Sequence, residues 1–140
     1  MRKYDLKQCA LEYIDDRLAD LKKYRAEQRE ICNKKATEAE RIQAEAEALD
    51  KKWRTMKTKP GKDKKRKAEM VLATKQEMNR KKHEARDLLD EARDANRNVD
   101  RSERREKVIT GVREKVTRWM DGVLVSRKPT FPNLIPRSAR

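Results

Sequence analysis

The chain has little of what an ordinary globular domain uses to fill a core. Only 35% of its 140 residues are apolar and 4% are aromatic, and it holds three glycines and four prolines. A compact domain has nearer half apolar residues. Low hydrophobicity together with 46% charged residues is typical either of disorder or of long helices that bury one narrow stripe, and the order of the residues separates these two cases.

Several kinds of chemical site lack the residues that they require. Cys9 and Cys32 have no CxxC spacing and no adjacent histidine, so we expect two reduced thiols rather than a disulfide framework or a zinc site. The single histidine, His83, has charged neighbours, Lys82 and Glu84, so we expect its side chain to be solvated. There is no glycine-rich phosphate loop, HExxH or GxSxG motif. We therefore expect no enzymatic activity, no cofactor or metal, and no small-molecule substrate.

The sequence also has no apolar run that approaches the length of a membrane span. Its first residues include Asp5, Glu12, Asp15 and Asp16, and this acidity fits neither a signal peptide nor a transit peptide. We expect an intracellular protein without a membrane partner, cytoplasmic or cytoskeletal, with a nuclear location as the alternative.

What the sequence does contain is a heptad frame. From Tyr4 to Met56 a chain of sixteen positions steps by three and four residues, and twelve of them are apolar. A frame that never slips over eight heptads predicts a coiled-coil helix. The seam residues on which this prediction depends most are Leu11, Ile14, Leu18, Leu21, Ile42, Leu49 and Trp53.

Pro60 and Gly61 interrupt this frame. Proline excludes the preceding residue from helical geometry and lacks an amide hydrogen, and glycine permits a tight reversal. A second frame then runs from Val71 to Val123, with eleven of sixteen positions apolar. Its principal seam residues are Met78, Leu88, Ile109, Val116 and Met120.

The predicted fold is all-α: a long antiparallel helical hairpin or coiled coil, two long helices joined at Pro60–Gly61. A short connection makes antiparallel neighbours the default, although arms that diverge and pair with other chains are the alternative. The predicted segments are a first helix over 1–57, a basic turn over 58–67, a second helix over 68–127 and an extended tail over 128–140. The run ANRNVD is poor in helix formers, so a break near 97–100 is one alternative, and we favour one continuous helix because the frame continues.

The seam is thin, because five of its positions are alanine and several more carry charges. Alanine buries little area, and stabilisation follows buried apolar area at about 25 cal/mol per Å². We expect the seam charges to weaken the hairpin further, and therefore expect partners in an assembly to complete it. These charges are Lys35, Lys81, Glu106 and Arg113.

The C-terminal part of the chain carries more apolar residues than one seam requires. A second stripe there indicates either a docking face for another protein or packing of the hairpin's own open end, two interpretations of equal weight. The tail has three prolines and should be extended, either disordered or ordered on a partner. The candidate docking residues are Val112, Trp119, Leu124, Phe131, Leu134 and Ile135.

The charge excess is local. Residues 58–67 hold six basic residues and one acid, and residues 128–140 hold three basic residues and none, whereas the two long segments each hold 15 basic and 12 acidic residues. The run KKRK resembles a nuclear-localisation signal, and it would also suit nucleic-acid phosphates, an acidic protein surface or simply a solvated turn. We favour the last two, because the turn has no aromatic residue for base stacking and the arms carry 24 acids. The candidate electrostatic contacts are Lys59, Lys62, Lys64, Lys65, Arg66 and Lys67.

Three function classes follow from this pattern. The first is a non-enzymatic structural coiled-coil accessory protein that binds along an acidic filament, such as an axonemal microtubule or a muscle thick filament, through basic charge and a C-terminal apolar anchor. The second is a helical subunit of a ribonucleoprotein, ribosomal or spliceosomal, that contacts RNA. The third is a homodimeric coiled-coil scaffold.

Overall fold

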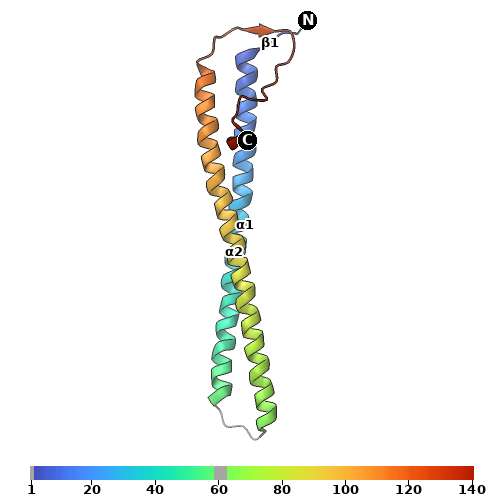
Figure 1. Ribbon diagram of the computed structural model, residues 1–140, viewed down its shortest axis with the longest axis vertical. Coiled ribbons are helices and arrows are strands. Elements are labelled where there is room, and N and C mark those ends of the chain that lie inside the picture. The colour runs from blue at the N-terminus through green and yellow to red at the C-terminus, as the bar shows by residue number, and fades with distance from the viewer. Residues whose placement is uncertain (1, 59–62) are drawn as a thin grey trace. The chain divides into compact units, whose positions relative to one another are not determined.

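The computed structural model describes residues 2–58 and 63–140, and two long helices that pack against each other account for most of it (Figure 1). The predicted all-α helical hairpin is confirmed. The elements in chain order are β1 (Tyr4–Asp5), α1 (Leu6–Thr58), α2 (Lys64–Thr117), β2 (Leu124–Val125) and the 3-10 helix η1 (Arg137–Ala139). The predicted turn at Pro60–Gly61 lies outside the described residues.

Residue contacts divide the chain into two compact units. Unit 1 comprises residues 1–29 and 96–140, and unit 2 comprises residues 30–95. Each unit therefore contains one stretch of α1 and one stretch of α2. The helix α2 runs without interruption through residues 97–100.

An aspartate begins each long helix. The Asp5 carboxylate accepts a hydrogen bond from the Gln8 amide at 3.0 Å, and the Asp63 carboxylate accepts one from the Arg66 amide at 3.2 Å. These bonds satisfy amide groups that have no partner inside the helix. Because Asp63 supplies this cap, α2 begins at Lys64, four residues before the predicted start at 68.

The end of α2 at Thr117 differs from the predicted end at 127. The last turn tightens, with the Trp119 amide donating to the Val116 carbonyl at 3.0 Å. Gly122 follows with a φ of +74°, a conformation that side chains with a Cβ rarely adopt. The chain then pairs with its own beginning, since β2 is antiparallel to β1 with Tyr4 opposite Val125, and the Leu6 amide donates to the Val123 carbonyl at 2.9 Å.

The predicted seam is present along both helices. Every named seam residue is buried or half-buried except Met120, which is 78% exposed because it lies beyond the end of α2. In unit 2 the buried residues are mainly small, with Ile42 and Met78 as the large members. The alanines there are Ala39, Ala46, Ala85, Ala92 and Ala95.

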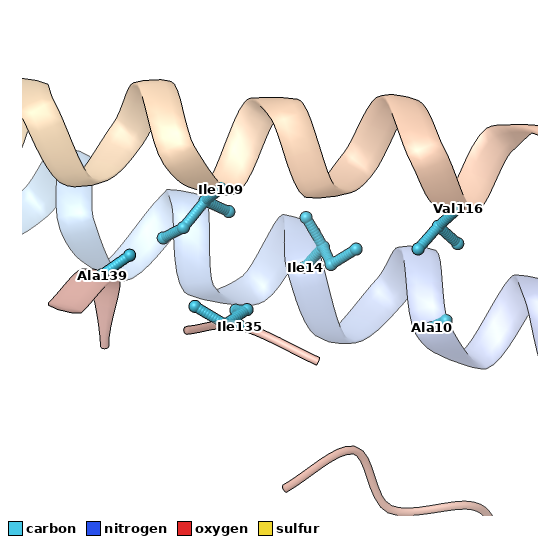
Figure 2. Close-up of a cluster of buried hydrophobic side chains, with 6 residues drawn as sticks. All are labelled: Ala10, Ile14, Ile109, Val116, Ile135 and Ala139. Carbon is cyan, nitrogen blue, oxygen red and sulfur yellow. The ribbon is translucent and has the colours of Figure 1, made fainter. Parts of the chain in front are cut away.

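Unit 1 has a broader core that includes the C-terminal tail. Ile14 of α1 lies between Ile109 and Val116 of α2, and Ile135 and Ala139 of the tail join the same cluster (Figure 2). The Phe131 ring lies 5.8 Å from the Tyr13 ring, centroid to centroid. The tail, which the sequence predicts to be extended, is therefore an ordered part of the unit 1 core and ends in the 3-10 helix η1.

The four seam charges have partners of opposite sign on the other helix. In unit 2, the Lys35 ammonium lies 2.9 Å from the Glu91 carboxylate, and that of Lys81 lies 2.8 Å from the Glu45 carboxylate. In unit 1, Arg113 pairs with Asp15 at 2.8 Å, and Glu106 pairs with Arg25. That these charges weaken the seam stays a prediction; each pair links one turn of α1 to one turn of α2.

Candidate interaction surface

The predicted basic cluster lies where α2 begins. Lys64, Lys65 and Arg66 are exposed and Lys67 is half-buried, all within the first helical turn rather than in a turn between helices. Lys59 and Lys62 lie outside the described residues. Cations are unfavourable at a helix N-terminus, which carries a partial positive charge of its own. The electrostatic potential at this end of α2, in unit 2, is therefore strongly positive.

The structure brings a second set of cations together, in unit 1. Arg101, Arg104 and Lys115 are exposed on α2, and we call them the cation stripe. Their spacing of three and eleven residues places them on one helix face. At about 100° per residue, these cations lie roughly 60° to 140° around the helix from buried Ile109 and Val116, to one side of the seam.

The cations of the stripe have no ion-pair partner within the described residues, as is also true of Lys107 on the same helix and of Arg118 just after it. Within residues 2–58 and 63–140, no carboxylate pairs with Arg101, Arg104 or Lys115, whereas the neighbouring cations Arg25 and Arg113 are both engaged with acids of α1. Unpaired guanidinium groups keep all their donors for an external carboxylate or phosphate. The stripe is therefore available to an anionic partner.

The heptad analysis missed this stripe, and the sequence holds only a weak signal for it. Neither Arg101 nor Lys115 has an acidic residue three or four positions away, so neither can form an intrahelical ion pair. Arg104 has Asp100 four positions before it, yet the two do not pair in the structure. The missing neighbours do not single out this face, because Arg29 and Arg113 lack them too and pair with acids of the other helix.

Most of the candidate docking residues pack against other residues of the chain itself. Ile135 is 2% exposed, and half-buried Phe131, Leu134, Val112 and Trp119 pack against the same cluster. Of the two interpretations of this apolar surplus, the structure has the one in which it packs the hairpin's own open end. These five residues therefore pack largely within unit 1, and that they also anchor a partner stays a prediction.

Leu124 is the exception among the docking residues. It is 57% exposed, and it lies in the short segment after α2 with Met120, which is 78% exposed, and Val123, which is 37% exposed. We call these three residues the apolar tip. Contiguous exposed apolar surface marks interaction sites more often than isolated apolar residues do, and these three lie within five residues of one another in the sequence.

The electrostatics of the inter-helix pairs contrast with the stripe. The hydrogen bond from Arg113 lowers the pKa of the Asp15 carboxyl below its usual value, and the same contact raises the pKa of Arg113. The hydrogen bond from Lys81 likewise lowers the pKa of Glu45, and the hydrogen bond that Lys35 donates to Glu91 raises the pKa of Lys35. These charges act within the chain, whereas the stripe and the start of α2 are among the positive surfaces that remain directed outward.

The remaining candidate groups for a chemical site are the two cysteines, the histidine and the carboxylates. Cys9 and Cys32 are half-buried free thiols and His83 is exposed. Within residues 2–58 and 63–140 no group of three or more His, Cys, Asp or Glu side chains is arranged to hold a metal ion. No helix in this part of the chain has a stretch apolar enough to cross a membrane.

Comparisons of the chain with family models, with curated proteins and with solved structures gave no match.

Proposed function

We propose that the chain is a non-enzymatic helical accessory protein that binds an acidic, repetitive surface, that of a cytoskeletal filament such as an axonemal microtubule or a muscle thick filament. The observation that carries the proposal is the cation stripe, Arg101, Arg104 and Lys115, exposed on a regular helix and without an internal partner. The apolar tip shortly follows the stripe in the sequence and supplies an additional apolar contact. Its residues are Met120, Val123 and Leu124.

The charge of unit 1 supports an anionic partner. Residues 1–29 and 96–140 together hold 20 basic and 11 acidic residues. Such an excess raises the association rate with an anionic surface and is screened beyond about 8 Å at physiological salt, so the residues nearest the partner matter most.

The rigid spacing of the stripe supports a regular partner. At a rise of about 1.5 Å per residue, Arg101 and Arg104 stand roughly 4.5 Å apart along the axis, and Lys115 follows roughly 16 Å further on. A helix holds these intervals fixed, which suits an array of carboxylates with a fixed repeat. Arginine adds two-pronged bonds to each carboxylate.

A ribonucleoprotein role is the second candidate, favoured by the same guanidinium groups because they also bind phosphates. The low exposure of the aromatic residues argues against this role. Of the six in the chain, all within the described part, Tyr24 is the most exposed and reaches only 38%. Single-stranded RNA is usually held by stacking on exposed rings, so we rank a filament first.

Co-sedimentation tests the proposal. The protein is mixed at low salt with polymerised microtubules and, separately, with reconstituted thick filaments, and we expect it to pellet with one of them. The triple variant Arg101→Gln, Arg104→Gln, Lys115→Gln should bind about tenfold more weakly, because each lost contact to a charged group is worth about 1 kcal/mol or less at an exposed site.

The matched control removes three cations that already have intrahelical partners: Lys34→Gln, Arg41→Gln and Arg80→Gln. It changes the net charge equally and should bind nearly as the wild type does. Equal losses in both triple variants would reject the stripe as the contact, and no pelleting with either filament would reject the function. Binding to an RNA homopolymer that falls log-linearly with salt concentration would instead favour the second candidate.

A further inference from the structure

Unit 2 contains a groove that its own two helices leave open. The groove has a volume of about 590 Å³ and runs beside the alanine seam, with Ala46 and Ala85 in its floor. Its α1 wall is formed by Gln43, Glu47 and Asp50, and its α2 wall by Lys82, Arg86, Leu89, Asp90 and Arg93. Both sets follow a spacing of three and four residues, so the groove follows the helices.

Leu89 shows that the groove is suited to an apolar contact. It is half-buried and stands one residue beyond the seam position Leu88, so it lies beside the seam rather than within it. A third or fourth helix widens the apolar stripe to include such flanking positions. The buried residues of unit 2 include five alanines, so its two-helix seam buries little area on its own.

The two walls of the groove carry opposite charge. The α1 wall has the acids Glu47 and Asp50, and the α2 wall has Lys82, Arg86 and Arg93 against the single acid Asp90. Asp50 pairs with Arg54 and Arg93 with Asp90, each within its own helix. Glu47, Lys82 and Arg86 have no ion-pair partner within the described residues.

From these observations we propose that a second copy of this chain occupies the groove, so that two hairpins pack groove to groove as a four-helix bundle about a two-fold axis parallel to the helices. This axis sets the acidic α1 wall of each copy against the basic α2 wall of the other. A two-fold axis perpendicular to the helices would instead set acidic wall against acidic wall.

The register of the hairpin makes the contact specific. The Lys81–Glu45 ion pair fixes these two turns at one level. Because the proposed axis keeps every residue at its own level, Glu47 of one copy lies within about one helical turn of Lys82 of the other. The symmetry repeats the contact, so each residue pair occurs twice in the interface. Screening beyond about 8 Å makes these local pairs outweigh the net positive charge of the whole chain.

Sedimentation equilibrium of the wild-type chain is the primary measurement, and we expect a reversible dimer at concentrations up to about 100 μM. Glu47→Lys places like charges together twice and should weaken the dimer about tenfold or more. The double variant Glu47→Lys, Lys82→Glu exchanges the two charges and should restore it to near the wild-type affinity. Glu84→Lys is the matched control, an exposed acid on α2 that does not line the groove.

A second pair of variants tests the apolar part of the groove. Leu89→Asp should dissociate the dimer, whereas Leu72→Asp should not, since Leu72 is 59% exposed on the same helix and lies outside the groove. Circular dichroism establishes that all variants keep the wild-type helix content. A monomeric wild type, a dimer indifferent to Leu89→Asp, or a double variant that stays dissociated would each overturn the proposal. None of these readouts depends on filament binding.

Discussion

Arg25 of α1 and Glu106 of α2 form an ion pair inside unit 1, where their side chains are only 13% and 26% exposed. Both residues occupy seam positions that a coiled coil normally fills with apolar side chains. The Arg25 Nε atom is buried and has no hydrogen-bond partner in the described part of the chain. Arg25 therefore relies on Glu106 to compensate a partly desolvated charge.

This dependence leads to the first prediction. Glu106→Ala leaves the Arg25 guanidinium without its carboxylate in a half-buried place and should lower the free energy of unfolding by about 1–3 kcal/mol. The control is Glu103→Ala, which breaks the pair with Arg29, where both side chains are about half exposed; that loss should stay below about 1 kcal/mol. Urea unfolding measures both, and a larger loss from Glu103→Ala would contradict the assignment.

The tail of unit 1 gives the second prediction. Ile135 is 2% exposed within a cluster drawn from α1, α2 and the tail, so Ile135→Ala should destabilise the protein by about 2–5 kcal/mol through lost burial and a residual cavity. Leu124→Ala, at a position that is 57% exposed, should change stability by less than about 0.5 kcal/mol. Thermal unfolding followed by circular dichroism compares them, and similar melting temperatures would mean that the tail does not pack as described.

The third prediction compares two glycines. Gly111 lies inside α2 with nothing within 4 Å of where a Cβ would stand, so Gly111→Ala should stabilise the protein by up to about 1 kcal/mol. Gly122 has the same open surroundings but a φ of +74°, so Gly122→Ala should destabilise it by about 1 kcal/mol or more. Both variants add the same methyl group. If the changes in the free energy of unfolding measured in urea have opposite signs, the backbone conformation is the cause.

The fourth prediction concerns acid. The folded state lowers the pKa of Asp15 from its ordinary 3.8 and that of Glu45 from its ordinary 4.5, so the pairs with Arg113 and Lys81 contribute stability above these values. That contribution is lost as the pH falls through the lowered pKa values. Asp15→Asn and Glu45→Gln should therefore melt below the wild type at neutral pH and approach it at acid pH.

A control variant completes the acid experiment. Asp16 is exposed and has no ion-pair partner within the described residues. Asp16→Asn should therefore melt close to the wild type at neutral pH. A deficit of Asp15→Asn or Glu45→Gln that persists unchanged into acid would show that the lost stability does not come from the ionised carboxylate.

The heptad frame predicted the hairpin seam well because the frame is a local property. Ile14, Ile42, Met78 and Ile109 are all buried where the spacing of three and four places them. Met120 continues the same frame in the sequence and is nevertheless exposed. The spacing of the apolar residues alone does not indicate that α2 ends at Thr117.

The features that the sequence did not predict depend on residues far apart in the chain. The segment after α2 pairs with Tyr4, and Ile135 packs on Ile14, contacts that no local pattern specifies. The seam charges show the same limit, since Arg113 is an isolated interruption in its own frame until Asp15 of the other helix meets it. The cation stripe shows this limit as well, because Arg29 lacks acidic neighbours in its own helix just as Arg101 does, and only the structure shows that Arg29 pairs with Glu103.

The tail that closes unit 1 also imposes an order on folding. Unit 2 can form by zipping from neighbouring residues, because its stretches of α1 and α2 follow each other closely in the chain. Unit 1 joins Ala10 and Ile14 to Ile135 and Ala139, and closing such a long loop is slow. During synthesis, Ala10 and Ile14 therefore gain their full cover only after residues 109–139 have also been made.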